Sequence, residues 1–287
     1  MGKIYSWERI ENGNIPTPDQ FSCAKRFVLD ELLKFVPEDI YGAKVFGSVA
    51  KNSPSNRSDF DLLVLINNEG VFGELNNLVQ EIKKETEVEV EPLVLTIDQA
   101  KQGLHTIDPN FYRHFQKIPN EGNLVGSDPL NMVQPFSESQ EKFLIDYLRQ
   151  KLRRFNQGGF DSSETEELNL IQRVLESPIA IGRKVISLLR EKNKFEWDED
   201  DDGKKSVIRN YKRLMDGLEI DTSDFDQIVS IDQKYNVFLK ESLEQKHDRR
   251  EYRQFLDDIK TESLPLARNW TMKTGVWLKD QFNSPTK

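Results

Sequence analysis

The stretch VFGSVAKNSPSNRSDFDLLVLI, Val45–Ile66, carries the clearest chemical pattern in the chain and best indicates its architecture. It begins with a short apolar run and a Gly-Ser pair, Gly47 and Ser48, and continues through a polar spacer. It ends in Ser-Asp-Phe-Asp, residues 58–61, followed by five apolar residues. We predict a strand, a glycine-rich turn with a short helical start, a loop and a second strand.

Two carboxylates, Asp59 and Asp61, begin the second predicted strand. Residues two apart on a strand point to the same face, so these side chains project together. Two carboxylates about 4 Å apart repel by roughly 4 kcal/mol at an effective dielectric constant near 20, and a cation between them reverses that sign. Oxygen ligands suit Mg²⁺, which binds one or two carboxylates and completes its shell with water and phosphates.

The Gly-Ser pair and the spacer supply groups that suit a phosphate. Gly47 lacks a Cβ and lets a ligand or backbone approach closely, and Ser48 offers a hydroxyl and a backbone N–H. Lys51 and Arg57 either add positive charge near the phosphates or are exposed loop cations, and the sequence leaves both interpretations open. An Asp-x-Asp alone is typical of solvated turns, but the whole combination predicts a site for a nucleoside triphosphate.

This pattern resembles the signature of the nucleotidyltransferase superfamily related to DNA polymerase beta, above all its minimal and kanamycin-type members. In those families a Gly-Ser pair is followed by Ala, a basic residue and later Ser-Asp-x-Asp. Here Ala50, Lys51 and Ser58 occupy the matching places, and Asn52 stands where a Gly is usual. The resemblance covers roughly residues 20 to 130.

The resemblance also implies a third carboxylate on a later strand, within the segment EVEVEPLVLT, Glu87–Thr96. Its spacing to Thr96 favours Glu91, with Glu89 as the alternative. Glu87, Glu89 and Glu91 share one face of the predicted strand, so alternation does not choose among them. A later acidic-Gly turn, followed by a short strand ending at Gly126, is also similar to the closing segment of small nucleotidyltransferases.

The implied fold class is α+β. A nucleotidyltransferase-type mixed sheet with helices occupies residues 1–130, and an all-α helical bundle for substrate or partner binding occupies residues 137–287. The implied enzyme is a Mg²⁺-dependent nucleotidyltransferase that moves an NMP group from an NTP, with ATP expected, to an acceptor hydroxyl and releases pyrophosphate.

The resemblance assigns roles residue by residue. Asp59, Asp61 and Glu91 would be the catalytic carboxylates and would hold one or two Mg²⁺ ions. The expected nucleotide-binding residues are Gly47, Ser48, Lys51 and Ser58.

Helical periodicity dominates the second half of the chain. We predict separate helices over 163–175 and 179–191, the latter opened by Pro178, and again over 249–259 and 264–279. Earlier, Phe111 and Phe115 mark another helical face. His247 has no Arg four to seven residues before it, so the sequence does not predict the ribonuclease motif of helical proteins that accompany minimal nucleotidyltransferases.

Composition limits the partners. The chain of 287 residues has a net charge of −9, a single cysteine, Cys23, and an acidic run at 198–202. No apolar run approaches the roughly 18 residues that span a bilayer, and the N-terminus lacks the apolar core of a signal peptide. We therefore expect a cytoplasmic protein without a membrane partner, with a small-molecule or protein acceptor rather than a nucleic acid. A homodimer or a partner protein would bind through the helical domain.

Two alternatives remain open. The first is a non-catalytic, antitoxin-like partner protein that keeps the nucleotidyltransferase fold. The second is a nucleotidyltransferase that adds nucleotides to nucleic-acid ends or makes a nucleotide signal. The clustered carboxylates argue against the first alternative, and the acidic balance argues against a nucleic-acid substrate.

Overall fold

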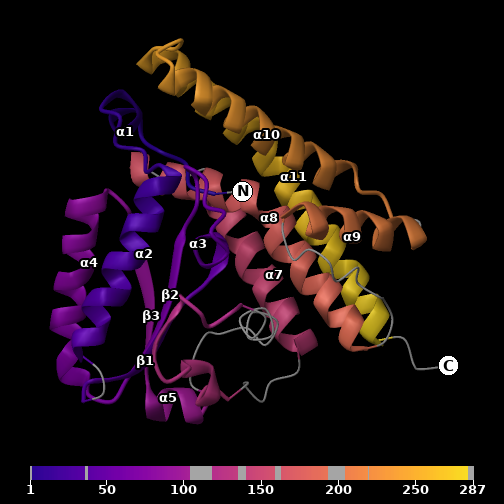
Figure 1. The fold of residues 1–287 in the computed structure, drawn as a ribbon. Helices are drawn as coiled ribbons and strands as arrows, with labels where there is room; N and C mark the ends of the chain where they lie inside the picture. Colours follow the sequence, from indigo (N-terminus) through magenta and orange to yellow (C-terminus); the bar gives the residue numbers. More distant parts are fainter. Residues whose placement is uncertain are drawn as a thin grey trace. The chain divides into compact units, whose positions relative to one another are not determined.

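A computed structural model describes residues 2–35, 38–103, 118–134, 140–158, 163–192, 204–218 and 220–283. The chain divides into two compact units, one of residues 14–137 and the other of residues 1–13 together with 138–287. We call them the sheet unit and the helical unit (Figure 1). The predicted helical face at Phe111 and Phe115 and the acidic run at 198–202 lie outside the described residues.

The sheet unit contains a four-stranded mixed sheet in the order β3-β2-β1-β4. Its strands are β1 (Ile40–Val45), β2 (Phe60–Ile66), β3 (Val90–Thr96) and β4 (Leu124–Gly126). Strand β1 pairs antiparallel with β2 and β4, whereas β2 pairs parallel with β3. The α+β class and the mixed sheet predicted from the sequence are confirmed.

Two long helices pack beside each other on the sheet, α2 (Pro18–Leu32) and α4 (Phe72–Thr86) (Figure 1). Helix α2 begins with a reciprocal capping box, in which Thr17 and Gln20 each bond the other's backbone N–H. Apolar residues at helical spacing then face the core and are buried: Phe21, Ala24, Val28 and Leu32 from α2, and Leu75, Leu78 and Ile82 from α4.

The central strand β2 is the apolar run that follows the two aspartates, and all its residues from 62 to 66 are buried. Lys44 of β1 lies on the face of the sheet opposite to Val45. It pairs with Leu63 in the strand register, and its amine donates to the Asp128 carboxylate. Asp128 caps the short helix η3 (Pro129–Asn131). Helix α5 (Ile97–Lys101) also contacts β2 and β3. A strand that is covered on both faces of its sheet has a continuous run of apolar residues, as β2 does.

The short elements complete the sheet unit. They are η1 (Leu33–Phe35), α3 (Gly47–Ala50) and η2 (Glu69–Val71). Helix α3 lies between β1 and β2, where the sequence predicted a short helical start after the Gly-Ser pair.

The helical unit consists of six described helices, and all except α1 come from the second half of the chain. They are α1 (Trp7–Glu11), α7 (Gln140–Gln157), α8 (Glu164–Glu191), α9 (Lys204–Gly217), α10 (Ser223–Leu243) and α11 (Arg249–Asn283). Helix α8 contacts α7, α9, α10 and α11, so it is the common packing partner of the bundle.

The prediction of separate helices on either side of Pro178 is wrong, because α8 runs continuously through this residue. Proline lacks the N–H that would bond the carbonyl of Val174, four residues earlier. The Ser177 hydroxyl donates to that carbonyl at 2.6 Å and replaces the missing bond. The predicted break between residues 259 and 264 is also wrong, since α11 continues through Pro265.

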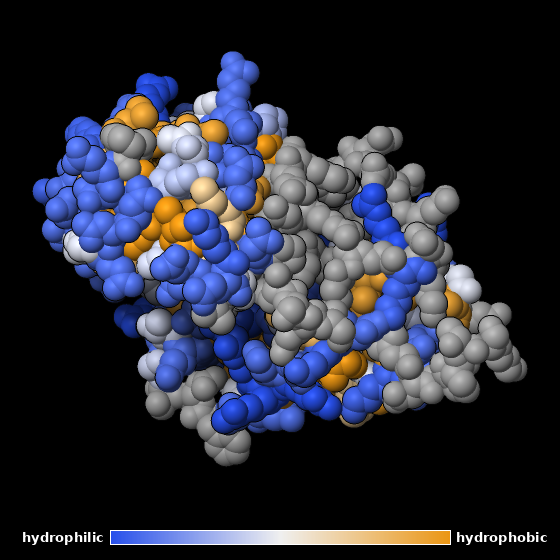
Figure 2. All heavy atoms as spheres, turned by 90° about the horizontal axis from the view of Figure 1, so that it is seen from below, coloured by the Kyte–Doolittle hydropathy of each residue, from blue (hydrophilic) through white to orange (hydrophobic). Residues whose placement is uncertain are grey.

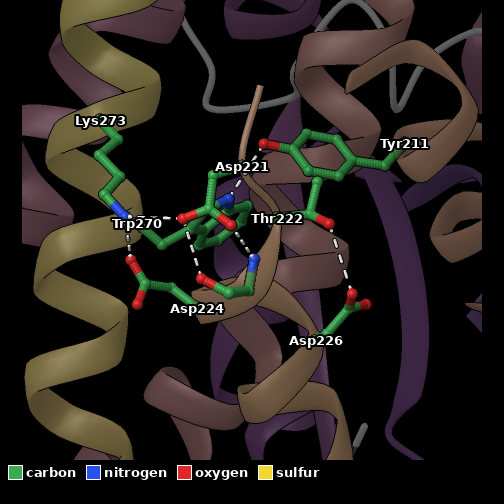
Figure 3. Close-up of polar contacts among 8 residues, drawn as sticks. Tyr211, Asp221, Thr222, Asp224, Asp226, Trp270 and Lys273 are labelled. Atoms are coloured by element: carbon green, nitrogen blue, oxygen red, sulfur yellow. Dashed lines mark hydrogen bonds and ion pairs between the residues drawn. The ribbon is translucent and has the colours of Figure 1, made fainter. Parts of the chain in front are cut away.

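Polar bonds join α9, α10 and α11 at one end of the bundle (Figure 3). The indole N–H of Trp270 donates to the Tyr211 hydroxyl at 3.0 Å, and Trp270 is buried. On the surface beside them, Lys273 of α11 bonds Asp224 at 2.8 Å and Asp221 at 3.5 Å. Trp270 is therefore a core residue of the helical unit.

Hydrogen bonds and a ring contact join the N-terminal segment to α10 and α11. The Tyr252 hydroxyl donates to the carbonyl of Tyr5 at 2.5 Å, and the N–H of Tyr5 donates to the Tyr235 hydroxyl at 3.2 Å. The Trp7 ring lies 5.7 Å from the Tyr252 ring. Since Tyr5 is 2% exposed, these residues form part of the helical core.

Hydrophilic residues predominate on the face drawn in Figure 2, with apolar residues visible in areas between them. Large apolar side chains that are more than half exposed include Val237 and Val276. None of the described helices has the length and apolar character needed to cross a membrane.

Candidate active site

The turn between β1 and β2 places the Asp61 carboxylate directly over the backbone of Gly47. A Cβ added to Gly47 would lie 2.2 Å from Oδ2 of Asp61, so a side chain at this position would displace the Asp61 carboxylate. Gly47 also has a φ of +65°, a conformation that favours glycine. The N–H of Phe46 donates to the Asp61 carbonyl at 2.8 Å and fixes the two strands at this point. Backbone conformation therefore favours glycine here, and glycine leaves the Asp61 carboxylate in its observed position.

Serine hydroxyls fold the spacer back onto the start of α3. The Ser58 hydroxyl accepts from the Ser48 hydroxyl at 2.9 Å and from the N–H of Ser55 at 2.8 Å. The N–H of Ser53 donates to the Ser48 carbonyl at 2.9 Å. Two of the predicted nucleotide-binding residues, Ser48 and Ser58, are thus in direct contact although they are ten positions apart.

The cations of the spacer differ in their surroundings. Lys51 is exposed, whereas Arg57 is buried, with 6% of its surface accessible. Asn52, where the related families usually have Gly, adopts a φ of 52°, which Asn tolerates better than most residues. Its side chain accepts a bond from Lys25 of α2 at 3.2 Å, and burial lowers the pKa of Lys25 below its ordinary value.

The parallel pairing of β2 with β3 brings two of the predicted carboxylates side by side. In the strand register, Asp61 stands opposite Glu91, so their side chains leave the same face of the sheet. Asp59 precedes Asp61 by two residues and is exposed. Glu89, the alternative to Glu91, forms an ion pair with Lys83 of α4 at 3.0 Å. The register and this ion pair both favour Glu91 over Glu89 as the partner of Asp61.

In the described part of the chain, no three His, Cys, Asp or Glu side chains lie close enough together to hold a metal ion. The structure therefore pairs Asp61 with Glu91 by register but does not form a three-carboxylate cluster with Asp59. Mg²⁺ needs only one or two carboxylates when water and phosphate oxygens complete its shell. The oxygen donors present, two of them on adjacent strands above a glycine turn, fit such an ion.

Sequence reasoning missed a buried charge on the same face of the sheet. Lys44 of β1 is 1% exposed, and its amine bonds the Asp128 carboxylate at 2.9 Å. Lys44 stands beside Leu63, which lies two residues beyond Asp61 on the same face. A single lysine within the apolar segment Ile40–Val45 was the signal, but its partner lies 84 positions away.

Residues 30–107 match the family model described as Polymerase beta, Nucleotidyltransferase. This part of the chain therefore carries a nucleotidyltransferase domain of the DNA polymerase beta-like superfamily, as the sequence predicted. The match contains the Gly-Ser turn, the two aspartates and both candidate glutamates. A search of the curated proteins finds no match to the chain.

Proposed function

We propose that the protein is a Mg²⁺-dependent nucleotidyltransferase that moves an NMP group from an NTP, with ATP as the preferred donor, to an acceptor hydroxyl. The observation that carries this proposal is the fit of Asp61 over Gly47, with Glu91 beside it in register. A glycine in close contact with one of two neighbouring carboxylates suits a site where phosphates and a metal meet the backbone.

In the proposed reaction, Ser48 and the backbone amides of the Gly47 turn bind the phosphates of the donor. Asp61 and Glu91, which are neighbours in the strand register, would hold the ion, and Asp59 would have to approach them to act as a third ligand. When bound, Mg²⁺ offsets the negative charge that develops on the attacking and leaving oxygens. The remaining catalytic contribution is positioning, because the bond from Ser48 to Ser58 and the packing of Asp61 on Gly47 fix both groups before the substrate arrives.

The acceptor in this proposal is a small molecule or a protein hydroxyl. The chain's net charge of −9 supports it, since an overall acidic surface attracts cations and repels a nucleic-acid backbone. The cytoplasm, with its supply of NTP and Mg²⁺, is the proposed location.

The decisive experiment compares Asp61→Asn with the wild type. We expect the variant to lose transfer of a labelled nucleotide and release of pyrophosphate while keeping its far-UV spectrum. Mg²⁺ with a non-hydrolysable triphosphate should raise the melting temperature of the wild type more than that of the variant. Glu85→Gln, an exposed carboxylate change on α4, is the control and should behave as the wild type. Equal melting shifts in all three proteins would remove the metal site from the proposal.

The absence of a three-carboxylate cluster among the described side chains favours one alternative, a non-catalytic partner protein with this fold. That alternative predicts no pyrophosphate release with any of the four NTPs, and binding of a partner protein that is unaffected by Asp61→Asn.

A further inference from the structure

The hydroxyl of Ser48 already has a hydrogen-bond acceptor within the protein. It donates to the Ser58 hydroxyl at 2.9 Å, although the two residues lie ten positions apart. A serine hydroxyl carries a single proton and therefore donates one hydrogen bond at a time. A phosphate oxygen that accepts from Ser48 must consequently take the place of Ser58. The bond that holds the Ser48 hydroxyl before the donor arrives is thus one that the donor has to replace.

This exchange of acceptors favours the phosphate. A hydrogen bond to a charged oxygen is roughly twice as strong as one between two neutral groups, so a phosphate oxygen is a better acceptor than the Ser58 hydroxyl. The backbone of Ser48 has a separate bond, because its carbonyl accepts from the N–H of Ser53 at 2.9 Å. The exchange therefore needs a rotation of the Ser48 side chain rather than a movement of α3.

Ser58 is also bonded to the turn that precedes it. Its hydroxyl accepts from the N–H of Ser55 at 2.8 Å, and its own N–H donates to the Ser55 carbonyl at 2.9 Å. These two bonds lie within the turn over residues 55–58, whereas the bond to Ser48 joins Ser58 to α3. Asp59 follows Ser58 directly in the chain. Opening the bond between Ser48 and Ser58 therefore removes a restraint immediately before Asp59.

Asp59 lies outside the strand that carries Asp61. Strand β2 begins at Phe60, and Asp59 is exposed. The register places Asp61 beside Glu91, but the described carboxylates form no group of three that could hold a metal ion. Asp59 thus has to move before it can share an ion with the other two. Carboxylates repel one another until a cation lies between them, so an ion bound to the triphosphate makes that movement favourable.

We propose that Ser58 is a positioning residue that couples donor binding to completion of the metal site. Before the donor arrives, Ser58 holds the Ser48 hydroxyl and restrains Asp59. A triphosphate then accepts the Ser48 proton, and the bond between Ser48 and Ser58 opens. Asp59 approaches Asp61 and Glu91 once this restraint is gone. The inference rests on the proposed function and adds an order to it, in which the phosphates bind first and the third carboxylate follows.

Ser58→Ala tests the exchange of acceptors, because it frees the Ser48 hydroxyl in advance. Titration calorimetry of the full chain with a non-hydrolysable ATP analogue and Mg²⁺ measures the effect. The donor no longer has to replace a neutral hydrogen bond, so we expect the variant to bind the analogue about 2- to 10-fold more tightly than the wild type. A residue that only maintains the fold, or that contacts the nucleotide itself, would change the affinity in the opposite direction. Unchanged or weaker binding would overturn the proposal.

Two further variants show whether the Ser58 hydroxyl is the cause. Ser53→Ala is the matched control, since it removes an exposed hydroxyl from the same spacer and keeps the backbone bond from Ser53 to Ser48. It should bind the analogue as the wild type does. Ser58→Thr keeps a hydroxyl and should return the affinity to near that of the wild type. An affinity in Ser58→Thr equal to that in Ser58→Ala would contradict the proposed role of the hydroxyl.

The movement of Asp59 has its own measurement, which applies even where Ser58→Ala fails to fold. Calorimetry compares Mg²⁺ binding by the wild type and by Asp59→Asn, with and without the analogue. Loss of a group that orients a metal ligand costs about 10- to 100-fold in affinity, so losing a ligand should cost at least about 10-fold when the analogue is present. Without the analogue the two proteins should bind Mg²⁺ equally. Weaker binding by Asp59→Asn in both conditions, or in neither, would overturn the proposed order.

The same titrations separate this proposal from the proposed function. A wild type that binds no triphosphate in the presence of Mg²⁺ would overturn both. If the wild type binds the analogue with Mg²⁺ and Asp61→Asn binds it much more weakly, the proposed site stands. The direction of the change in Ser58→Ala then decides the coupling by itself. Because each readout is binding, a chain that lacks transferase activity still tests the role of Ser58.

Discussion

The two units of the protein hold their chemically important groups in different ways. In the sheet unit, short-range contacts do so: Ser48 bonds Ser58 ten positions away, and Gly47 lies under Asp61. In the helical unit the groups come from distant parts of the chain, as in the bonds of Tyr5 to Tyr235 and Tyr252, 230 and 247 positions away. A single substitution in the turn should therefore disturb the whole site. In the packed helices, many contacts hold each group, so one substitution should have a smaller effect.

The largest expected effect is that of Gly47→Ala. The added methyl group overlaps Oδ2 of Asp61 and occupies a backbone conformation with φ of +65°. A displacement of about 1 Å at a reacting centre costs roughly 10²-fold, so we expect kcat/KM to fall by at least that factor. Gly73→Ala is the control, because a Cβ there meets nothing within 4 Å. Full activity in Gly47→Ala would show that Asp61 does not need its observed position.

The choice between the two glutamates is the next test. Glu91→Gln should reduce transfer as strongly as Asp61→Asn, because Glu91 stands beside Asp61 in the register. Glu89→Gln removes a partly exposed ion pair with Lys83 and should cost at most about 1 kcal/mol of stability, with little loss of transfer. Steady-state kinetics of both variants distinguish the two glutamates. A larger loss of transfer in Glu89→Gln than in Glu91→Gln would make Glu89 the third carboxylate.

An intermediate effect, on stability alone, is expected in the helical unit. Tyr252→Phe removes the hydroxyl that donates to the buried carbonyl of Tyr5, and an unsatisfied buried acceptor costs about 1–3 kcal/mol. For a chain of this size, each kcal/mol lowers the melting temperature by roughly 2–4 °C. Calorimetry should show this shift, with Tyr41→Phe in the sheet unit as the control. An unshifted melting transition would mean that the N-terminal segment contributes nothing to the helical core.

The smallest effect concerns Asn52, whose φ is 52°. Asn52→Gly and Asn52→Ala both remove the amide that accepts from Lys25, so the difference between them isolates the backbone term. We expect Ala to be less stable than Gly by about 1–2 kcal/mol, the usual cost of a left-handed conformation for a residue with a Cβ. Denaturant unfolding measures the difference, and equal stabilities would mean that the turn rearranges.

The sequence was sufficient to predict the strand, turn and strand around the Gly-Ser pair because that structure is local. Gly47, Ser48, Asp59 and Asp61 fall within 15 consecutive residues, but β2 begins at Phe60, so strand alternation orients Asp61 and not Asp59. The resemblance already favoured Glu91 by its spacing to Thr96, but its place opposite Asp61 comes from the register of β2 against β3, which no local pattern contains. Lys44 appeared in the sequence as an exception in an apolar strand, but its partner Asp128 depends on the path of the chain after β4.

In the helical half, periodicity predicted most of the helices but not their continuity. Pro178 predicts a helix boundary from its missing N–H, and the compensating bond from Ser177 to Val174 appears only in the folded structure. The approach of Lys151 and of Lys184 to the Tyr147 ring, at 5.4 and 4.7 Å from its centre, was likewise not predicted. On α7, Tyr147 and Lys151 follow ordinary helical spacing, and only the packing of α8 brings Lys184 to the same ring.

The hydrogen bonds that join the N-terminal segment to α10 and α11 bear on how the protein folds during its synthesis on the ribosome. Tyr5 is synthesised before its hydrogen-bond partner Tyr235, which follows 230 residues later. At a synthesis rate of about 5–20 residues per second, roughly 10–50 s pass before the side chains of Ile4, Tyr5 and Ile10 can be buried. During that interval the whole sheet unit, which lies between these residues and α10 in the sequence, is translated and can fold. The helical core is therefore completed only after the sheet unit has been made.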